Sequence, residues 1–158
     1  MPFRIDSIDA RILELLQEDG RMSSTEIVRR LGDVSERIVR HRIKRMVEEQ
    51  IIRISAIVNP AAIGFGVTAD VWVETEASAT TKLAAALTEL DQISYVSYST
   101  GDQNISLQVH AINLTELHHY VNEVISKLPG VRRTTITIIP FTLKDIDQWK
   151  IPGSVIRR

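Results

Sequence analysis

The period of the hydrophobic pattern changes along the chain, and this change restricts the possible folds more than any other feature. In the first fifty residues apolar side chains recur at helical spacing, as in Ile8, Ile12 and Leu16. After residue 66, segments that alternate apolar and polar residues are interspersed with helical ones. Because neither a helical nor a β fold satisfies both periods, we predict an α+β protein with a helical first domain.

Three helices are predicted before residue 50. Each follows a side chain that can cap its first turn: Asp6, Ser23 and Ser35. Gly20 and Gly32 are suited to end the first two helices, because glycine readily takes the left-handed conformation. The third helix is expected to run to about Glu49.

The third helix has two chemically different faces. At 100° per residue, one side collects the apolar residues Ile38, Val39, Ile43, Met46 and Val47. The opposite side collects Arg37, Arg40, His41, Lys44 and Glu48. Residues 29–45 contain seven basic and two acidic side chains, although the whole chain has a formal net charge of −1. Arg42 lies at the flank of the apolar side, where a salt bridge and a DNA contact both stay open.

Such an arrangement is typical of a helix-turn-helix domain, whose last helix enters the major groove of DNA. The N-terminal part of that helix reaches base edges, so the predicted base or nearby phosphate contacts are Ser35, Arg37, Arg40 and His41. The predicted phosphate contacts are Arg29, Arg30, Lys44 and Arg45. A solvated basic helix face is the alternative interpretation.

The second half predicts a ferredoxin-like βαββαβ sandwich. Its expected strands are 67–74, 93–100, 105–111 and 131–139, and Ser78 and Asn113 are positioned to cap the two helices. An earlier strand over 51–58 would complete a winged first domain. The expected domains are therefore 1–50 for DNA binding, 51–64 as linker and hinge, 65–144 for sensing and oligomerisation, and 145–158 as a tail.

One face of this sheet would remain uncovered by helices. Trp72 and other large side chains are expected there, and exposed apolar area of this kind is unfavourable in a monomer. We therefore expect a homodimer that pairs two sheets and places two recognition helices on a pseudo-palindromic DNA site.

Several motifs resemble those of the Lrp/AsnC (feast/famine) transcriptional regulators. The first is the run Ile8-Asp9-x-x-Ile12-Leu13-x-x-Leu16-Gln17-x-Asp19-Gly20-Arg21-x-Ser23, and the second is Ser35-x-x-x-Val39-x-x-Arg42-Ile43-x-Arg45-Met46. The resemblance covers residues 5–143. It implies a DNA-binding regulator that forms dimers and higher homo-oligomers and senses a small molecule such as an amino acid.

The resemblance also implies an effector loop near the end of the second strand. Its candidate residues are Tyr98, Thr100, Gly101, Asp102 and Asn104, with Thr134 opposite. Asn104 replaces the usual aspartate, which removes a charge for an α-amino group. Gln50 replaces a glycine at the end of the third helix, and the turn before Ser35 is one residue longer, so that helix is expected to start or end differently.

Other function classes are disfavoured. The chain has no cysteine, which excludes disulfides, Cys-ligated metal sites and a cysteine nucleophile. It has neither an apolar run of about 18 residues nor a secretion signal, so we expect a cytoplasmic protein without a membrane segment. His119 and Glu123 could share a metal, but a surface pair is favoured, and we predict no metal, no cofactor and no enzymatic activity. A tetrapyrrole decarboxylase-like enzyme and an effector-independent architectural DNA-binding protein stay open as alternatives.

Overall fold

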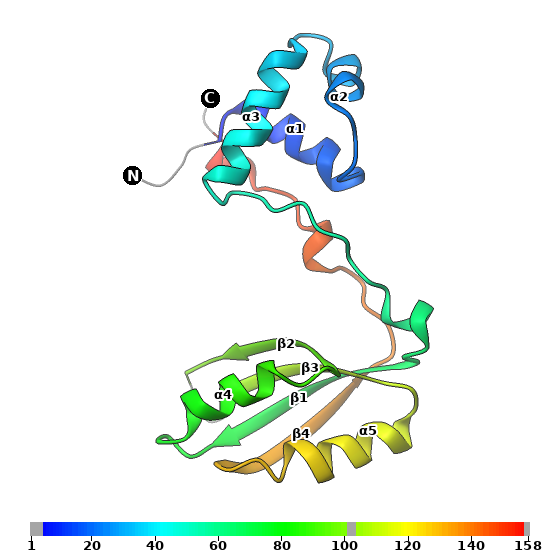
Figure 1. The fold of residues 1–158 in the computed structure, drawn as a ribbon, viewed down its shortest axis with the longest axis vertical. Coiled ribbons are helices and arrows are strands. Elements are labelled where there is room, and N and C mark those ends of the chain that lie inside the picture. The colour runs from blue at the N-terminus through cyan, green and yellow to red at the C-terminus, as the bar shows by residue number, and fades with distance from the viewer. Residues whose placement is uncertain (1–4, 101–103, 157–158) are drawn as a thin grey trace. The chain divides into compact units, whose positions relative to one another are not determined.

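The computed structural model describes residues 5–100 and 104–156. They divide into two compact units (Figure 1). One unit contains the chain up to Ile57 together with the residues from Leu143 on, and the other contains Val58–Thr142. None of the described helices is long and apolar enough to cross a membrane.

The first unit is built on the helices α1 (Ser7–Glu18), α2 (Ser24–Leu31) and α3 (Glu36–Glu48). Their predicted caps are confirmed, since Asp6, Ser23 and Ser35 each accept backbone N–H groups of the following turn. Gly32 ends α2 in the left-handed conformation at φ 77°. The helices enclose a small core of Ile12, Leu13, Ile27, Val39 and Met46.

Two predictions for the helix ends of this unit are wrong. Gly20 does not end α1, because the chain is already extended at Asp19, whose carbonyl accepts the Met22 N–H at 2.9 Å. Gln50 adopts the left-handed conformation at φ 57° in place of a glycine, and Met46 O accepts the Ile51 N–H at 2.8 Å. The left-handed conformation costs a residue with a Cβ atom about 1 kcal/mol, and Gln50 tolerates this strain.

The apolar face of α3 is also narrower than predicted. Val39 and Met46 are fully buried, whereas Ile38 and Val47 are 43% and 44% exposed. The helices α1 and α2 cover only a narrow arc of α3, centred on the line from Val39 to Met46.

The strand predicted over 51–58, and with it the wing, is absent. Residues 52–59 form no strand, because a strand needs a hydrogen-bonded neighbour and none of the described residues supplies one. The segment that follows contains the 3₁₀ turn η1 (Pro60–Ile63), capped by Asn59 and ended by Gly64 at φ 103°.

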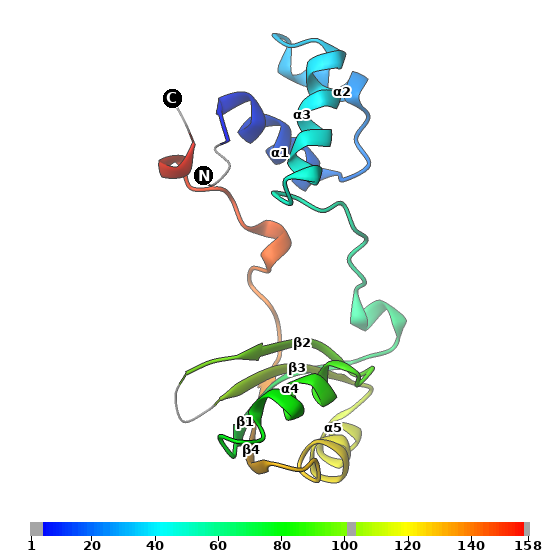
Figure 2. The same ribbon diagram turned by 60° about the vertical axis from the view of Figure 1, so that its left-hand side comes forward.

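The second unit has the predicted ferredoxin-like topology. Its strands are β1 (Val67–Thr75), β2 (Ile93–Tyr98), β3 (Ile105–Ala111) and β4 (Val131–Ile139), ordered β2-β3-β1-β4 and paired antiparallel. The helices α4 (Thr80–Thr88) and α5 (Leu114–Tyr120), which η2 (Val121–Ile125) continues, lie on the same face of the sheet (Figure 2). Asn113 caps α5 as predicted, with its Oδ1 2.9 Å from the Glu116 N.

The prediction that Ser78 caps α4 is wrong. A turn precedes this helix, because Glu76 O accepts the Ala79 N–H at 2.9 Å, and α4 begins only at Thr80. The Thr80 hydroxyl is buried and lies 2.7 Å from that of Thr75, which ties the start of α4 to the end of β1.

The two faces of the sheet differ sharply in polarity. The covered face carries the main core, which includes Val71, Leu107 and Leu117. On the opposite face Trp72 is half-buried, and its cross-strand partners are Ser106 and Thr135. Tyr95 and Ile139 are the other large side chains on this face, as the pairs Tyr95–Gln108 and Thr68–Ile139 show, but strand alternation places mainly Thr, Ser, Gln and His residues around them.

The C-terminal residues are ordered into two short 3₁₀ turns, η3 (Ile146–Gln148) and η4 (Gly153–Val155). They belong to the same compact unit as α1, α2 and α3.

Candidate nucleic-acid interface

The start of α3 is fixed by the turn that precedes it. Ser35 Oγ accepts the Ile38 N–H at 3.4 Å, so this hydroxyl caps the helix. The longer turn is closed by Arg11, whose Nη1 lies 2.7 Å from Asp33 Oδ2. The Arg11 guanidinium also lowers the pKa of the Asp33 carboxyl. The extra turn residue therefore leaves Ser35 as the cap of α3.

The outer face of α3 presents four of the predicted DNA-binding side chains to solvent: Arg37, Arg40, His41 and Lys44. Arg40 pairs with Glu36, and Lys44 Nζ lies 3.6 Å from Glu48 Oε1. Pairs this exposed stabilise a protein by only about 0.2–1 kcal/mol, so a phosphate can replace the carboxylate. Within the described residues Arg37 has no ion pair, and it borders a shallow hollow with Glu36 and Arg40.

Two further arginines of α3 point inward to a buried carboxylate. Asp9 of α1 accepts Arg42 Nη1 at 2.8 Å and Arg45 Nη2 at 3.0 Å. Its side chain is 1% exposed, and the Asp6 N–H donates to it at 3.1 Å. Arg42 is thus a structural group, and the placement of Arg45 argues against the predicted phosphate contact, which stays a prediction.

Asp6 completes this cluster, which we call the Asp9 clamp (Asp6, Asp9, Arg42 and Arg45). Arg42 Nη1 lies 2.7 Å from Asp6 Oδ2. Partial burial raises the pKa of Asp6, but hydrogen bonds from Arg42 and from the N–H groups of Asp9 and Ile8 outweigh it and lower the pKa. The salt bridge that the sequence left open for Arg42 is confirmed. The sequence analysis missed its partners and the part of Arg45, although an acid within the apolar spacing of α1 is a usable signal for them.

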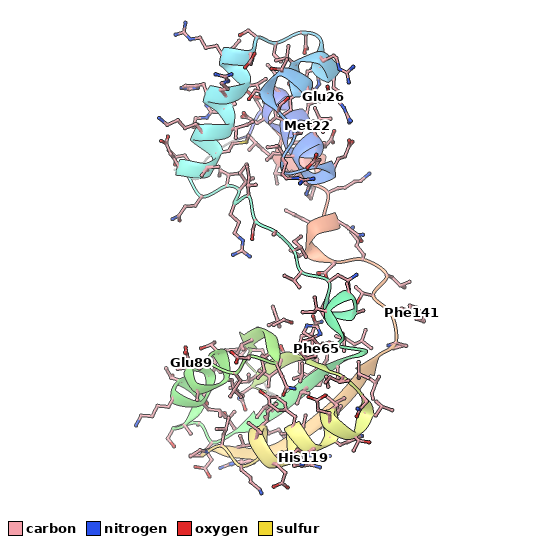
Figure 3. All side chains as sticks on the ribbon, turned by 45° about the vertical axis from the view of Figure 1, so that its right-hand side comes forward. Met22, Glu26, Phe65, Glu89, His119 and Phe141 are labelled. Atoms are coloured by element: carbon pink, nitrogen blue, oxygen red, sulfur yellow. The ribbon has the colours of Figure 1, made fainter. Side chains whose placement is uncertain are left out.

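The predicted phosphate contacts on α2 are exposed and paired with acidic neighbours. Arg29 Nη2 lies 2.7 Å from Glu26 Oε1, and Arg30 Nη1 lies 2.5 Å from Glu18 Oε2. Hydrogen bonds from Arg29 and Arg30 lower the pKa of Glu26, which is labelled on α2 in Figure 3. Both arginines are available to phosphates only by exchange of these partners.

The candidate effector loop is described in part, because Gly101 and Asp102 lie outside the described residues. Tyr98 is exposed at the end of β2 and is paired in register with Ile105. The predicted strand to Thr100 is two residues too long, since β2 ends at Tyr98.

Asn104 has a structural function at the base of this loop. Its Oδ1 accepts the Thr75 N–H at 3.2 Å, next to the register shift between Glu74 and Thr75. Its carbonyl also accepts the Ser99 N–H at 2.7 Å. The uncharged amide therefore holds the loop against β1.

Thr134 lies on the helix-covered face of β4. Thr134 is paired with Val73 of β1, and Val73 is paired with Ile105, the first residue of β3 after the loop. The Thr134 hydroxyl is 3.0 Å from the Ser126 hydroxyl. The structure therefore brings Thr134 to the loop end of the sheet, but with a partner near α5.

The described residues contain no group of three His, Cys, Asp or Glu side chains that could hold a metal. Glu123, the possible partner of His119, forms an ion pair with Lys127, whose hydrogen bond lowers the Glu123 pKa. The side chain of His119 is labelled in Figure 3.

Two family models match the chain, one to each unit. Residues 5–47 match the AsnC-type helix-turn-helix domain, and residues 68–148 match the Lrp/AsnC ligand binding domain. The chain belongs to the Lrp/AsnC family of transcriptional regulators. It therefore combines a DNA-binding and a ligand-binding domain, and the predicted family and function are confirmed.

Relatives of this Lrp/AsnC regulator match over nearly their full length. An HTH-type transcriptional regulator of Pyrococcus furiosus is 37% identical over 92% of this chain and 95% of its own. The HTH-type transcriptional regulator FL11 of Pyrococcus abyssi is 32% identical, with coverage of 96% and 99%.

Solved structures agree with the fold. E. coli AsnC superimposes with a TM-score of 0.82 at 25% identity, over 92% of this chain and 99% of that one. A transcriptional regulator of Neisseria meningitidis, solved as a complex with L-Met, has a TM-score of 0.84 at 22% identity, with coverage of 94% and 96%.

Proposed function

We propose that this regulator binds double-stranded DNA as a homodimer, at a pseudo-palindromic site. The N-terminal half of α3 enters the major groove, where Arg37, Arg40 and His41 contact base edges or nearby phosphates. Arg29, Arg30 and Lys44 contact phosphates. Ser35, which caps α3, also contacts a base edge or a nearby phosphate at the start of the helix.

The division of arginines on α3 is the single observation that supports this proposal best. The side chains of Arg42 and Arg45 are directed inward to Asp9 of α1. Those of Arg37, Arg40 and His41 are exposed on the opposite side of the helix. One helix face is thus anchored by ion pairs, and the other is cationic and accessible. A merely solvated face would not need the inward arginines to fix its orientation.

Gel-shift titration over a salt series tests DNA binding. The logarithm of affinity for DNA upstream of its own gene is expected to fall linearly with the logarithm of salt concentration, with a slope of about −0.9 per neutralised phosphate. Arg37→Ala is expected to weaken binding by about 1–3 kcal/mol, as loss of one base contact does. Arg132→Ala, an exposed arginine of β4, is the matched control. A salt-independent affinity, or equal losses in both variants, contradicts the assignment of α3.

We further propose that the effector is an amino acid bound at the loop after β2. The proposed contacts are Tyr98, Thr100, Gly101, Asp102, Asn104 and Thr134. The location of this loop in the domain that matches the ligand-binding model supports the proposal. The relative from Neisseria was solved with L-Met, so L-Met is the first probe to use.

Calorimetric titration with L-Met checks this assignment through Asn104. Asn104→Asp restores a negative charge facing an α-amino group and is expected to tighten binding about tenfold, equivalent to ~1.4 kcal/mol. Asn113→Asp, at the cap of α5, adds the same charge elsewhere as the control. Unchanged L-Met affinity in Asn104→Asp, or equal gains in both variants, contradicts this position for the ammonium group.

We propose that the protein acts in the cytoplasm as a regulator without catalytic activity. The names of its relatives favour regulation over the tetrapyrrole decarboxylase and the architectural alternatives. Absence of product formation with a tetrapyrrole substrate is the corresponding expected result.

A further inference from the structure

The C-terminal segment contacts the helical unit, although it extends past both family matches. Those matches end at residues 47 and 148. Ile151 packs against the apolar core of the helical unit, and Gln17 Nε2 donates to Trp149 O at 2.7 Å. Residues 132 positions apart are therefore joined, and the segment lies beside α1 in Figure 1.

The segment is locally ordered before it reaches α1. The Asp145 N–H donates to Gln148 Oε1 at 3.3 Å, and Asp145 Oδ1 accepts the Ile146 N–H at 2.6 Å. Leu143 and Ile146 are 87% and 79% exposed, whereas Ile151 is half-buried. Ile151 is therefore the apolar side chain of this segment that packs against the core of the helical unit.

The helix that receives this segment also orients α3. Gln17 belongs to α1, and so does Asp9, which holds Arg42 and Arg45 of α3. A force transmitted through the segment would therefore act on the helix that positions the DNA-binding face.

The segment also forms part of a second connection between the two units. The chain leaves the helical unit after Ile57 and returns at Leu143. The return comes shortly after the end of β4 at Ile139, and β4 is hydrogen-bonded to β1 in the ligand-binding sheet. Two covalent connections therefore join the units, one before β1 and one after β4.

We propose that residues 143–156 act as a strap. The strap docks in cis on α1, completes the core of the DNA-binding unit through Ile151, and restricts the movement of α3 relative to the ligand-binding domain. Its effect on DNA binding rests on the proposed function, because a restricted pair of recognition helices binds two half-sites with a higher effective concentration.

Cross-linking tests the docking. Because the chain has no cysteine, Gln17→Cys with Lys150→Cys introduces the only two thiols. A short bismaleimide is expected to produce a cross-linked single chain. The control is a mixture of the single variants Gln17→Cys and Lys150→Cys. In this mixture a cross-link between position 17 of one chain and position 150 of another forms only when the segment docks on a second copy. Exclusive formation of such dimers, or no cross-link, overturns docking in cis.

A charge placed in the contact tests the contribution to the core. Ile151→Asp is expected to lower the melting temperature of the helical unit and to increase hydrogen exchange in α1. Ile151→Ala is a milder form with a smaller effect in the same direction. Val155→Asp, whose parent side chain is 57% exposed, is the matched control. Equal effects of Ile151→Asp and Val155→Asp overturn the role of Ile151.

Cutting the connection tests the tether. A protease site inserted between Thr142 and Leu143 allows the folded protein to be severed while Ile151 stays docked. We expect affinity for a DNA probe with two half-sites to fall about tenfold on cutting, with little change on one half-site. Unchanged affinity after cutting overturns the tether. Failure of the uncut protein to bind DNA contradicts the proposed function instead.

Discussion

At the scale of single residues, the Asp9 clamp determines which arginines are available to DNA. A buried carboxylate is costly unless it is paired, and Asp9 receives Arg42, Arg45 and the Asp6 N–H. The cost of burial is thereby offset, and Arg42 and Arg45 are held towards α1 by their ion pairs with Asp9. Recognition is left to the residues on the other side of the helix.

We therefore expect Asp9→Asn to destabilise the helical unit by about 2 kcal/mol, somewhat below the 3–5 kcal/mol typical of a broken buried pair, because Asp6 still holds Arg42. Urea denaturation measures this loss. Asp33→Asn, which removes the exposed partner of Arg11, serves as the control and is expected to cost much less, because an exposed ion pair contributes little to stability. Similar losses in the two variants would show that the clamp is not a stability determinant.

At the scale of elements, His110 connects three strands of the sheet. Its Nδ1 lies 3.0 Å from Thr68 Oγ1 on β1, and its Nε2 lies 2.8 Å from Ser94 Oγ on β2. The ring also lies near that of Phe65, with centroids 6.5 Å apart and ring planes tilted by 56°, and Phe65 is labelled in Figure 3. Burial among these groups lowers the pKa of His110 below 6.5.

This lowered pKa predicts that the sheet unit loses stability in mild acid. The unfolded chain binds a proton below pH 6.5 while the folded imidazole stays neutral, so stability is complete above pH 6.5 and declines as the pH falls through that value towards the folded pKa. Thermal denaturation between pH 7.5 and pH 5 of the native protein and of His110→Gln measures the effect. The variant is expected to show a flatter pH dependence, and identical profiles would exclude His110 as its source.

Elements differ in how far their own residues determine them. Caps such as Asp6 and Asn113 were predicted correctly because their hydrogen bonds close within three residues. The strand expected over 51–58 was wrong because a strand depends on a partner that local pattern cannot supply. For the same reason the exposed arginines of α3 could be predicted from its periodicity, whereas the pairing of Arg45 with Asp9, 36 positions away, could not.

At the scale of the whole molecule, the proposed dimer determines how two DNA-binding units act together. The uncovered sheet face is largely polar, and an antiparallel sheet can keep one such face in water. Exposed apolar area therefore does not by itself require a dimer. Trp72, between Ser106 and Thr135, is the largest apolar group on this face, and a second copy could cover it together with Tyr95 and Ile139.

If two copies pair through this face, Trp72→Ala should weaken the dimer by about 2 kcal/mol or more, because a buried tryptophan is a common hot spot of interfaces. Sedimentation of the native protein is expected to give at least twice the 17.8 kDa of one chain, with dissociation at higher concentration in the variant. Trp149→Ala, in the C-terminal segment, is the control for loss of a tryptophan outside the sheet.

Because two half-sites bind tightly only when two α3 helices are joined, Trp72→Ala should also bind a two-site probe with nearly the affinity of a single-site probe. A variant that stays dimeric would instead place the interface elsewhere, and the exposed apolar residues Ile54, Ile57 and Val58 of the linker would be the next surface to substitute.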